Sequence, residues 1–233
     1  FWSPDVYEGS PNRATVFMAT IVKAAAFAGF IRLFAVGFGE LKEPVWMNAV
    51  IVASAISIIL GNAAASMQTN AKRLLAYSGI AQTGYMLIAF IGLDFSANVW
   101  NLLIYLTGYI SATLVVFTII DILDSEGKAS DLKVFEGLGV NNKGLTFALI
   151  VAMFSMIGIP LTIGFVGKYA ILTAAFYVKP WLVVAALVGS AIGIGVYFNF
   201  FKYAVMSRTD KPLPKLNTTA GQKITVAFCT LVI

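Results

Sequence analysis

The sequence contains no histidine, a single cysteine and few charged residues. Without histidine it cannot build a bis-histidine haem site, the usual zinc sites or a Ser-His-Asp triad. Cys229 has no partner cysteine, so this chain forms neither an internal disulfide nor an iron–sulfur cluster. We therefore expect any redox or metal chemistry that the protein serves to lie in other chains, and we expect no cofactor in this one.

The composition indicates a membrane protein. Only 12% of the 233 residues are charged and 59% are hydrophobic, whereas about a quarter of the residues in a soluble domain are charged. The chain begins with Phe1 rather than methionine, and its last apolar run is shorter than the roughly 20 residues that a spanning helix needs. We expect it to be an internal or C-terminal piece of a longer membrane protein.

Several apolar segments are long and continuous enough to be predicted as helices. The fifth would reach about 48 Å as one straight helix, well beyond the roughly 30 Å hydrocarbon core. Gly158 and Pro160 lie inside it, and because proline removes a backbone donor we expect the helix to break there. The predicted segments are residues 14–36, 45–66, 74–93, 99–121, 145–176, 181–203 and a shortened 223–233.

Basic residues are distributed unevenly between the two sides of this predicted bundle. Most lie in the N-terminal segment and after the second, fourth and sixth helices, whereas only Lys42 and Lys179 lie in the opposite loops. By the positive-inside rule, the N-terminal segment is predicted to be cytoplasmic. The mixed charges of residues 121–143 predict a solvated, partly helical surface segment, and the prolines of 207–222 predict an extended connection.

Lys23 lies near the middle of the first apolar segment, and no acidic residue in that segment can pair with it. A charge within the membrane is costly, so its presence indicates a function by default. Ala24, Ala25, Ala26 and Gly29 are small, so we expect another helix to pack closely and Lys23 to face the bundle. An amine that gains and loses a proton there would serve as a proton relay. The alternative is a static lysine satisfied by backbone carbonyls and water.

Lys168 lies a few residues beyond Pro160, where a broken helix exposes unpaired backbone groups at membrane depth. Such groups are tolerated only inside protein or beside a water-filled cavity. We therefore predict a second proton-carrying amine, and the alternative is a lysine that strong helix tilting brings near the membrane surface. Arg32 is expected to extend to the far membrane surface.

The third and fourth helices hold weaker candidates. Lys72, at the start of the third, is either a topology signal or a possible relay group. Gln82 is deep enough in the same helix to order water. Tyr105 and Tyr109 are interpreted as helix–helix hydrogen-bonding groups that, beside buried lysines, could belong to a hydrated line.

Several motifs together resemble subunit N, the antiporter-like proton-channel subunit of bacterial respiratory complex I. The run Asp5-Val6-Tyr7-Glu8-Gly9 favours subunit N over its sister subunits and over the related sodium/proton antiporter subunits. The other matching stretches are Lys23 with Arg32-Leu33-Phe34, Gly61-Asn62 to Asn70, Lys72 to Ser78, and Gly158 to Lys168.

This resemblance implies an all-helical fold with two inverted five-helix repeats, each containing a broken helix. In this single membrane domain, residues 1–44 would end the first repeat, 45–206 would form the second, and 207–233 would be a connection and a truncated last helix. Lys23 would then connect two half-channels, and Lys168 would be the terminal lysine on the outward path. A missing N-terminal half would hold another lysine and its glutamate partner.

The resemblance also implies a function, which is proton translocation in the NADH–quinone oxidoreductase of a bacterial inner membrane. NADH, FMN, iron–sulfur clusters and quinone would be bound by other subunits of that enzyme. The partners would be other membrane subunits and the lipid bilayer, and not nucleic acid. Gln82 stands where the family often has a histidine, which puts a histidine-dependent step in doubt. A subunit of a multi-subunit cation/proton antiporter is the alternative, and a passive membrane scaffold is a third hypothesis.

Overall fold

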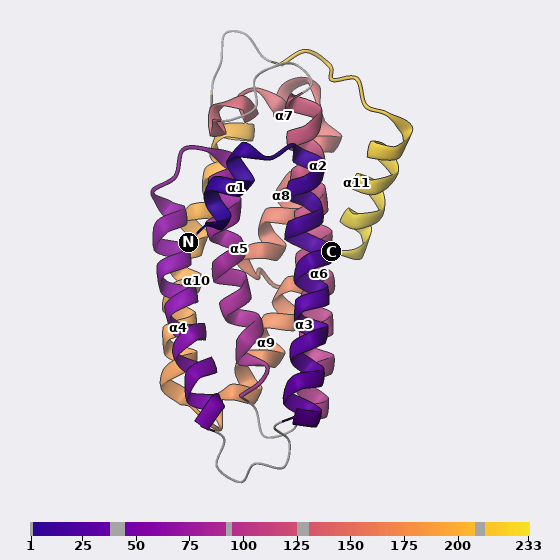
Figure 1. Ribbon diagram of the computed structural model, residues 1–233. Coiled ribbons are helices and arrows are strands. Elements are labelled where there is room, and N and C mark those ends of the chain that lie inside the picture. The colour runs from indigo at the N-terminus through magenta and orange to yellow at the C-terminus, as the bar shows by residue number, and fades with distance from the viewer. Residues whose placement is uncertain (1, 38–44, 92–94, 125–130, 208–212) are drawn as a thin grey trace.

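The computed structural model describes residues 2–37, 45–91, 95–124, 131–207 and 213–233, which form a bundle of long helices (Figure 1). The helices are α1 (Ser3–Gly9), α2 (Asn12–Phe17), α3 (Lys23–Arg32), α4 (Val45–Ser66), α5 (Ala71–Ile88), α6 (Phe95–Asp124), α7 (Leu138–Asn141), α8 (Lys143–Ile157), α9 (Ile163–Phe176), α10 (Pro180–Phe201) and α11 (Ala220–Val232). Shorter π-helical and 3₁₀ segments are η1 (Met18–Val22), η2 (Leu33–Gly37), η3 (Leu132–Phe135) and η4 (Lys202–Met206).

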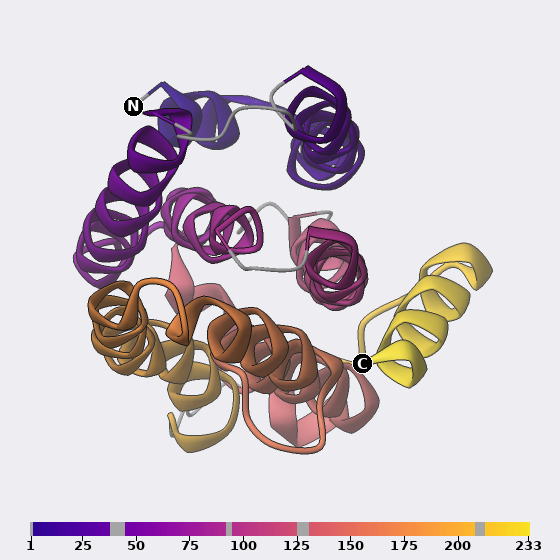
Figure 2. The same cartoon turned by 90° about the horizontal axis from the view of Figure 1, so that it is seen from below.

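Four helical segments in the described part of the chain are long and apolar enough to cross a membrane, judged by length and composition. They are Asn12–Arg32, Trp46–Ser66, Ser96–Asp124 and Pro180–Met206. Viewed along the bundle, α5 and α6 lie at the centre and α11 lies at the outer edge (Figure 2). Most of the 18 residues of α5 are buried, so the surrounding helices shield its polar side chains from lipid.

The predicted break in the fifth segment is confirmed. Helix α8 ends at Ile157, α9 begins at Ile163, and Pro160 lies between them. Gly158 caps α8 with a φ of 89°, in the left-handed region that glycine adopts at little steric cost. The side chain of Thr162 then starts α9 by accepting a hydrogen bond from the backbone amide of Phe165 at 3.3 Å.

Small residues allow α9 to lie close to its neighbours. A Cβ atom on Gly164 would collide with the carbonyl oxygen of Ser155, and one on Gly167 would lie 2.7 Å from the Cα atom of Tyr105. Close backbone approach at glycine is typical of helix packing in membranes. The second half of the broken helix is therefore held firmly against α8 and α6.

The connection after α6 differs from the prediction. Helix α6 runs to Asp124 rather than to residue 121. The described residues 131–142 are partly helical, as predicted, but only some of them are exposed to solvent. Leu132, Phe135 and Leu138 are buried in one apolar cluster. The Phe135 ring packs edge-on against Phe200, with 5.2 Å between the ring centroids. This segment therefore closes one end of the bundle as an apolar cap, and residues 125–130 lie outside the described part.

The connection before α11 is irregular from Leu213 to Thr218, as predicted for the part that the structure describes, and Pro212 lies outside it. Asn142 holds this strand-like segment in place. Its side-chain amide donates to the carbonyl of Pro214 at 2.9 Å and its side-chain oxygen accepts from the backbone amide of Leu216 at 2.9 Å. Helix α11 then begins with a capping box in which Thr219 and Gln222 bond reciprocally.

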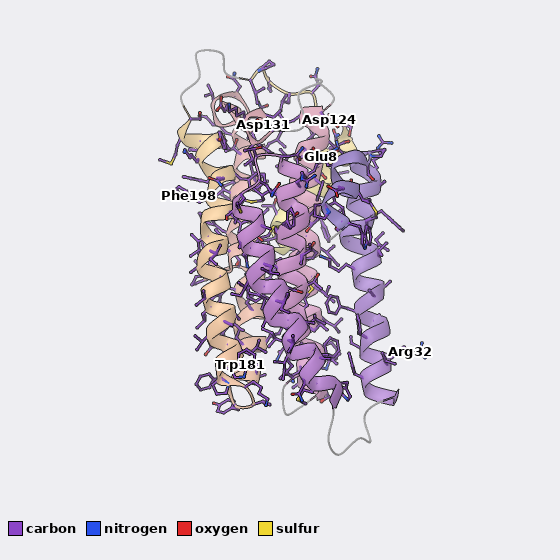
Figure 3. All side chains as sticks on the ribbon, turned by 60° about the vertical axis from the view of Figure 1, so that its left-hand side comes forward. Glu8, Arg32, Asp124, Asp131, Trp181 and Phe198 are labelled. Atoms are coloured by element: carbon purple, nitrogen blue, oxygen red, sulfur yellow. The ribbon has the colours of Figure 1, made fainter. Side chains whose placement is uncertain are left out.

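Residues before the first long helix form α1, which the sequence prediction did not include. Arg73, in the first turn of α5, makes ion pairs of 2.7 Å with Asp5 and 2.8 Å with Glu8. Pro4 lies in the first turn of α1, where its missing amide costs nothing. Glu8 lies toward the same end of the bundle as Asp124 and Asp131, and Arg32 lies toward the opposite end with Trp181 (Figure 3).

Candidate functional site

Lys23 faces the interior of the bundle, as predicted. Its Nζ atom donates to the carbonyl oxygen of Gly79 on α5 and to the hydroxyl oxygen of Tyr109 on α6, both at 2.9 Å. The same nitrogen lies 4.5 Å from the centroid of the Tyr109 ring, a cation–π distance. Ala25, Ala26 and Gly29, the small residues expected to admit a neighbouring helix, are exposed in the described part of the chain.

The local helix geometry contributes to the position of Lys23. The π-helical segment Met18–Val22 comes immediately before it. A π-helical turn changes the angle at which the following side chains leave the helix, and such turns occur frequently at functional sites. Within this π-helical segment, the side chain of Thr20 donates a hydrogen bond to the carbonyl of Val16 at 2.7 Å.

Lys168 lies inside the bundle at the break between α8 and α9. Its Nζ atom donates to the carbonyl oxygens of Met156 at 2.8 Å and Ile157 at 3.1 Å. It also lies 4.5 Å from the centroid of the Tyr85 ring. The last carbonyls of a helix have no partner within the helix, so the end of α8 creates the acceptors that this amine uses. Its residue exposure of 7% places it in the interior and not at the surface of the bundle.

Gln82 joins four helices through one amide group. Its Nε2 atom donates to the carbonyl of Met156 at 3.0 Å and to the hydroxyl of Tyr197 at 2.7 Å. Its Oε1 atom accepts a hydrogen bond from the hydroxyl of Tyr105. The amide of this buried side chain is therefore occupied by protein groups on α6, α8 and α10, whereas the sequence suggested that it would order water.

Two hydrogen-bonded sets of polar groups start at the two buried lysines and approach each other on α6. Lys168 and Gln82 meet at the Met156 carbonyl, and Gln82 is bonded to Tyr105. Tyr105 and Tyr109 lie four residues apart on α6, so their side chains leave the same face of the helix about 6 Å apart along its axis. Tyr109 is bonded to Lys23. Lys23, Gln82 and Lys168 thus lie in the same polar region inside the bundle.

Lys72 lies apart from these groups, near the end of the bundle that carries α1. Its residue exposure is 8%, and its Nζ atom donates to the carbonyl of Ser10 at 3.3 Å. Asn70 caps the start of α5 by accepting from the backbone amide of Lys72 at 2.9 Å. Lys72 is thus covered by the segment that follows α1 rather than joined directly to Lys23.

A cavity of about 460 Å³ borders Lys168 on the side of α9 and α10. Its walls are mainly apolar and include Ile159, Pro160 and Leu187. Ser190 is a polar exception, and its hydroxyl lies 2.9 Å from the hydroxyl of Tyr85. The buried amine therefore has interior partners on one side and an open volume on the other.

Comparison with known proteins identifies the family. A family model described as "NADH:quinone oxidoreductase/Mrp antiporter, TM" matches residues 1–193. The chain belongs to this family. Its relatives include two proteins named NADH-quinone oxidoreductase subunit N. The one from Cytophaga hutchinsonii is 39% identical over 85% of this chain and 43% of the relative. The one from Desulforamulus reducens is 35% identical over 97% of this chain and 47% of the relative. The chain spans a little under half the length of these curated relatives.

Solved structures agree. A chain in the structure titled "Respiratory complex I from Thermus thermophilus with bound Aureothin" is 34% identical and has a TM-score of 0.83, over 100% of this chain and 50% of that one. A chain of the Mrp complex from Dietzia sp. matches with a TM-score of 0.77 over 91% of this chain and 39% of that one, and at 20% identity this likeness concerns the fold alone. The predicted resemblance to subunit N and the all-helical antiporter-like membrane fold are confirmed.

Sequence reasoning missed two tyrosines of the site in this family member. Tyr85 donates to the carbonyl of Ala186 at 3.0 Å and presents its ring to Lys168. Tyr197 bonds Gln82, and its hydroxyl lies 2.5 Å from that of Ser78. Spacing along α5 is the signal that could have found Tyr85, because it follows Gln82 by three residues and shares its face. Tyr197 has no such neighbour in sequence.

Proposed function

We propose that this chain moves protons across the membrane as part of a proton-translocating subunit of NADH–quinone oxidoreductase. One observation carries the proposal: inside an apolar bundle, polar groups extend from Lys23 and from Lys168 toward each other and end at Tyr109 and Tyr105, on the same face of α6. Amines and hydroxyls both donate and accept protons, and intramembrane ionisable groups mark proton relays.

The partners of the two lysines suit this role. Both amines donate to carbonyl or hydroxyl oxygens, and within the described residues neither forms an ion pair with a carboxylate. A buried carboxylate would hold an ammonium permanently charged, because breaking a buried pair is costly. Neutral oxygens accept hydrogen bonds from both the charged and the neutral amine, so either lysine can change its protonation state without losing its acceptors.

The proposed orientation of the chain in the membrane rests on the distribution of basic residues. We take the end that carries α1 and most of the basic loop residues as the cytoplasmic side of a bacterial inner membrane. Lys72 would stand near the entrance, Lys23 would receive the proton in the membrane, and Lys168 would pass it outward beside the break. NADH, FMN, iron–sulfur clusters and quinone would be bound in other subunits of the complex, and other antiporter-like membrane subunits would be the neighbours.

The test uses the intact complex in sealed vesicles, with Lys23→Met and Lys168→Met variants and the exposed Lys202→Met as the matched control. NADH-driven quinone reduction and proton uptake are measured together, and native gels report assembly. Both buried-lysine variants should assemble and lose most proton uptake, with lower coupled quinone reduction, while Lys202→Met should match the unmodified complex. Normal proton uptake by an assembled Lys23→Met complex would disprove the proposed role.

A subunit of a multi-subunit cation/proton antiporter is the second candidate, favoured by the fold match to the Mrp complex. It predicts exchange of sodium for protons across vesicles without any electron donor, and abolition of that exchange in Lys23→Met. The leading proposal predicts proton uptake only while NADH is oxidised. The same vesicles, assayed with a sodium gradient and without NADH, distinguish the two.

A further inference from the structure

A second cavity, of about 630 Å³, lies between the start of α8 and helix α11, away from the buried lysines. Three basic residues, Lys143, Lys215 and Lys223, belong to its rim. The apolar lining residues come mainly from α8 and α11 and include Leu145, Phe147, Ala148, Val226, Ala227 and Leu231. Asn141, Asn142, Thr218 and Thr230 are the neutral polar residues of the lining. The cavity is thus a groove that is cationic at one end and mainly apolar along its length. We call it the α8–α11 groove.

The groove extends from the end of the bundle toward the middle of the membrane. Lys143 is the first residue of α8, and Lys223 lies in the first turn of α11. Farther along α11, the carbonyl of Ile233 accepts a hydrogen bond from the backbone amide of Ile163, beside the break, at 2.9 Å. The groove therefore runs along α11 from the basic rim toward the depth of Lys168.

The three lysines at the rim are available to a ligand. All three are exposed, and none forms an ion pair with a described carboxylate. The neighbouring Asn142, by contrast, is fully used in holding the segment from Pro214 to Leu216. Basic pockets between membrane helices near the cytoplasmic surface bind anionic lipid head groups. The charge at the rim thus selects an anion, and the apolar length below it selects an acyl chain.

We propose that the α8–α11 groove binds one anionic phospholipid. Its phosphate lies among Lys143, Lys215 and Lys223, and an acyl chain runs along Phe147, Val226 and Leu231. Helix α11 packs mainly on α6 and less on α8, so the lipid fills the space that separates α11 from α8. This binding site involves none of the residues assigned to proton transfer and is independent of that role.

The test uses the full-length protein purified with its complex and reconstituted in vesicles. The probe is phosphatidylglycerol with a photoreactive diazirine in one acyl chain, and phosphatidylcholine with the same acyl chain is the zwitterionic counterpart. Cross-linked peptides are identified by mass spectrometry. We expect phosphatidylglycerol to label residues 145–148 and 226–231 at least several-fold more than phosphatidylcholine does.

Two kinds of variant distinguish the effect of the basic charge at the rim from the effect of the shape of the groove. The double variant Lys215→Ala, Lys223→Ala should lower phosphatidylglycerol labelling at least several-fold. The control double variant Lys133→Ala, Lys202→Ala removes two exposed lysines that do not line the groove. This control should leave phosphatidylglycerol labelling unchanged. Ala227→Trp fills the groove without changing its charge and should abolish labelling by both lipids. Equal labelling by the two lipids would overturn the proposed anion selectivity. An absence of labelling by either lipid in the unmodified protein would overturn the lipid site.

Discussion

Lys168 and Gln82 donate to the same backbone oxygen, the carbonyl of Met156, at 2.8 and 3.0 Å. Two helices that flank the end of α8, α9 and α5, are thereby tied to one atom. That atom is free to accept from both because the α8 helix ends at the next residue. The broken helix therefore supplies a meeting point for a lysine amine and an amide side chain, in addition to space for them.

Removing the amide of Gln82 should disrupt the site. Gln82→Leu leaves the buried hydroxyl of Tyr105 without its amide partner, which costs about 1–3 kcal/mol, whereas the hydroxyl of Tyr197 keeps its contact with Ser78. We expect a lower melting temperature in detergent and a loss of proton uptake in vesicles. Gln82→His keeps a donor and an acceptor on the ring and should retain uptake to within a few-fold. Equal uptake by the leucine and histidine variants would contradict a role for the polar group.

Tyr109→Phe tests the contact with Lys23. The substitution keeps the aromatic ring 4.5 Å from Nζ but removes the hydroxyl that lies 2.9 Å from it. Because positioned proton-transfer groups typically contribute large rate factors, we expect proton uptake to fall by on the order of tenfold or more while the complex assembles normally. Tyr169→Phe, on the exposed side of α9, is the matched control. A normal rate in Tyr109→Phe would place the path elsewhere.

Gly158→Ala tests the geometry of the break. At a φ of 89° a side chain costs of order 1–3 kcal/mol, and the new Cβ atom would lie 3.1 Å from Cδ of Lys168. We expect thermal unfolding at a lower temperature and weaker proton uptake. Gly195→Ala is the control, because a Cβ atom in that α10 position meets open space and alanine favours a helix by about 0.5–1 kcal/mol. Equal stability of the two variants would contradict the left-handed cap.

Asn142→Ala tests the clamp on the segment before α11. The substitution removes the hydrogen bonds to the carbonyl of Pro214 and from the amide of Leu216, at a cost of about 1–3 kcal/mol. We expect faster hydrogen exchange at residues 213–219 and faster proteolysis there, since local opening depends on such bonds. The exposed Asn217→Ala should leave both rates unchanged. Unaltered exchange in Asn142→Ala would show that packing alone holds the segment.

The sequence predicted those features that have a strong local signal. A lysine inside an apolar run is conspicuous because of its cost in the membrane, and this identified Lys23 and Lys168. Gly158 and Pro160 predicted the break for a similar reason, since each has its own backbone preference. These residues needed no knowledge of the tertiary structure.

Other parts of the site depend on packing and could not be found in this way. Tyr85 and Tyr197 stand in apolar segments, where a tyrosine serves equally well as a packing residue or as a hydrogen-bonding one. Their partners come from other helices far along the chain. The apolar cap with Phe135 was missed because its short helical pieces carry mixed charges nearby, and only the structure shows which face is buried.

Helix α5 contacts both buried amines, through the carbonyl of Gly79 at Lys23 and the ring of Tyr85 at Lys168. The two contact points are about 9 Å apart on one rigid rod, and its first turn is fastened to α1 through Arg73. A small slide or rotation of this rod would change the surroundings of both lysines in a single movement. Helix α5 thus links the surroundings of Lys23 and Lys168 mechanically, and a displacement of α1 at the surface has a direct route to both.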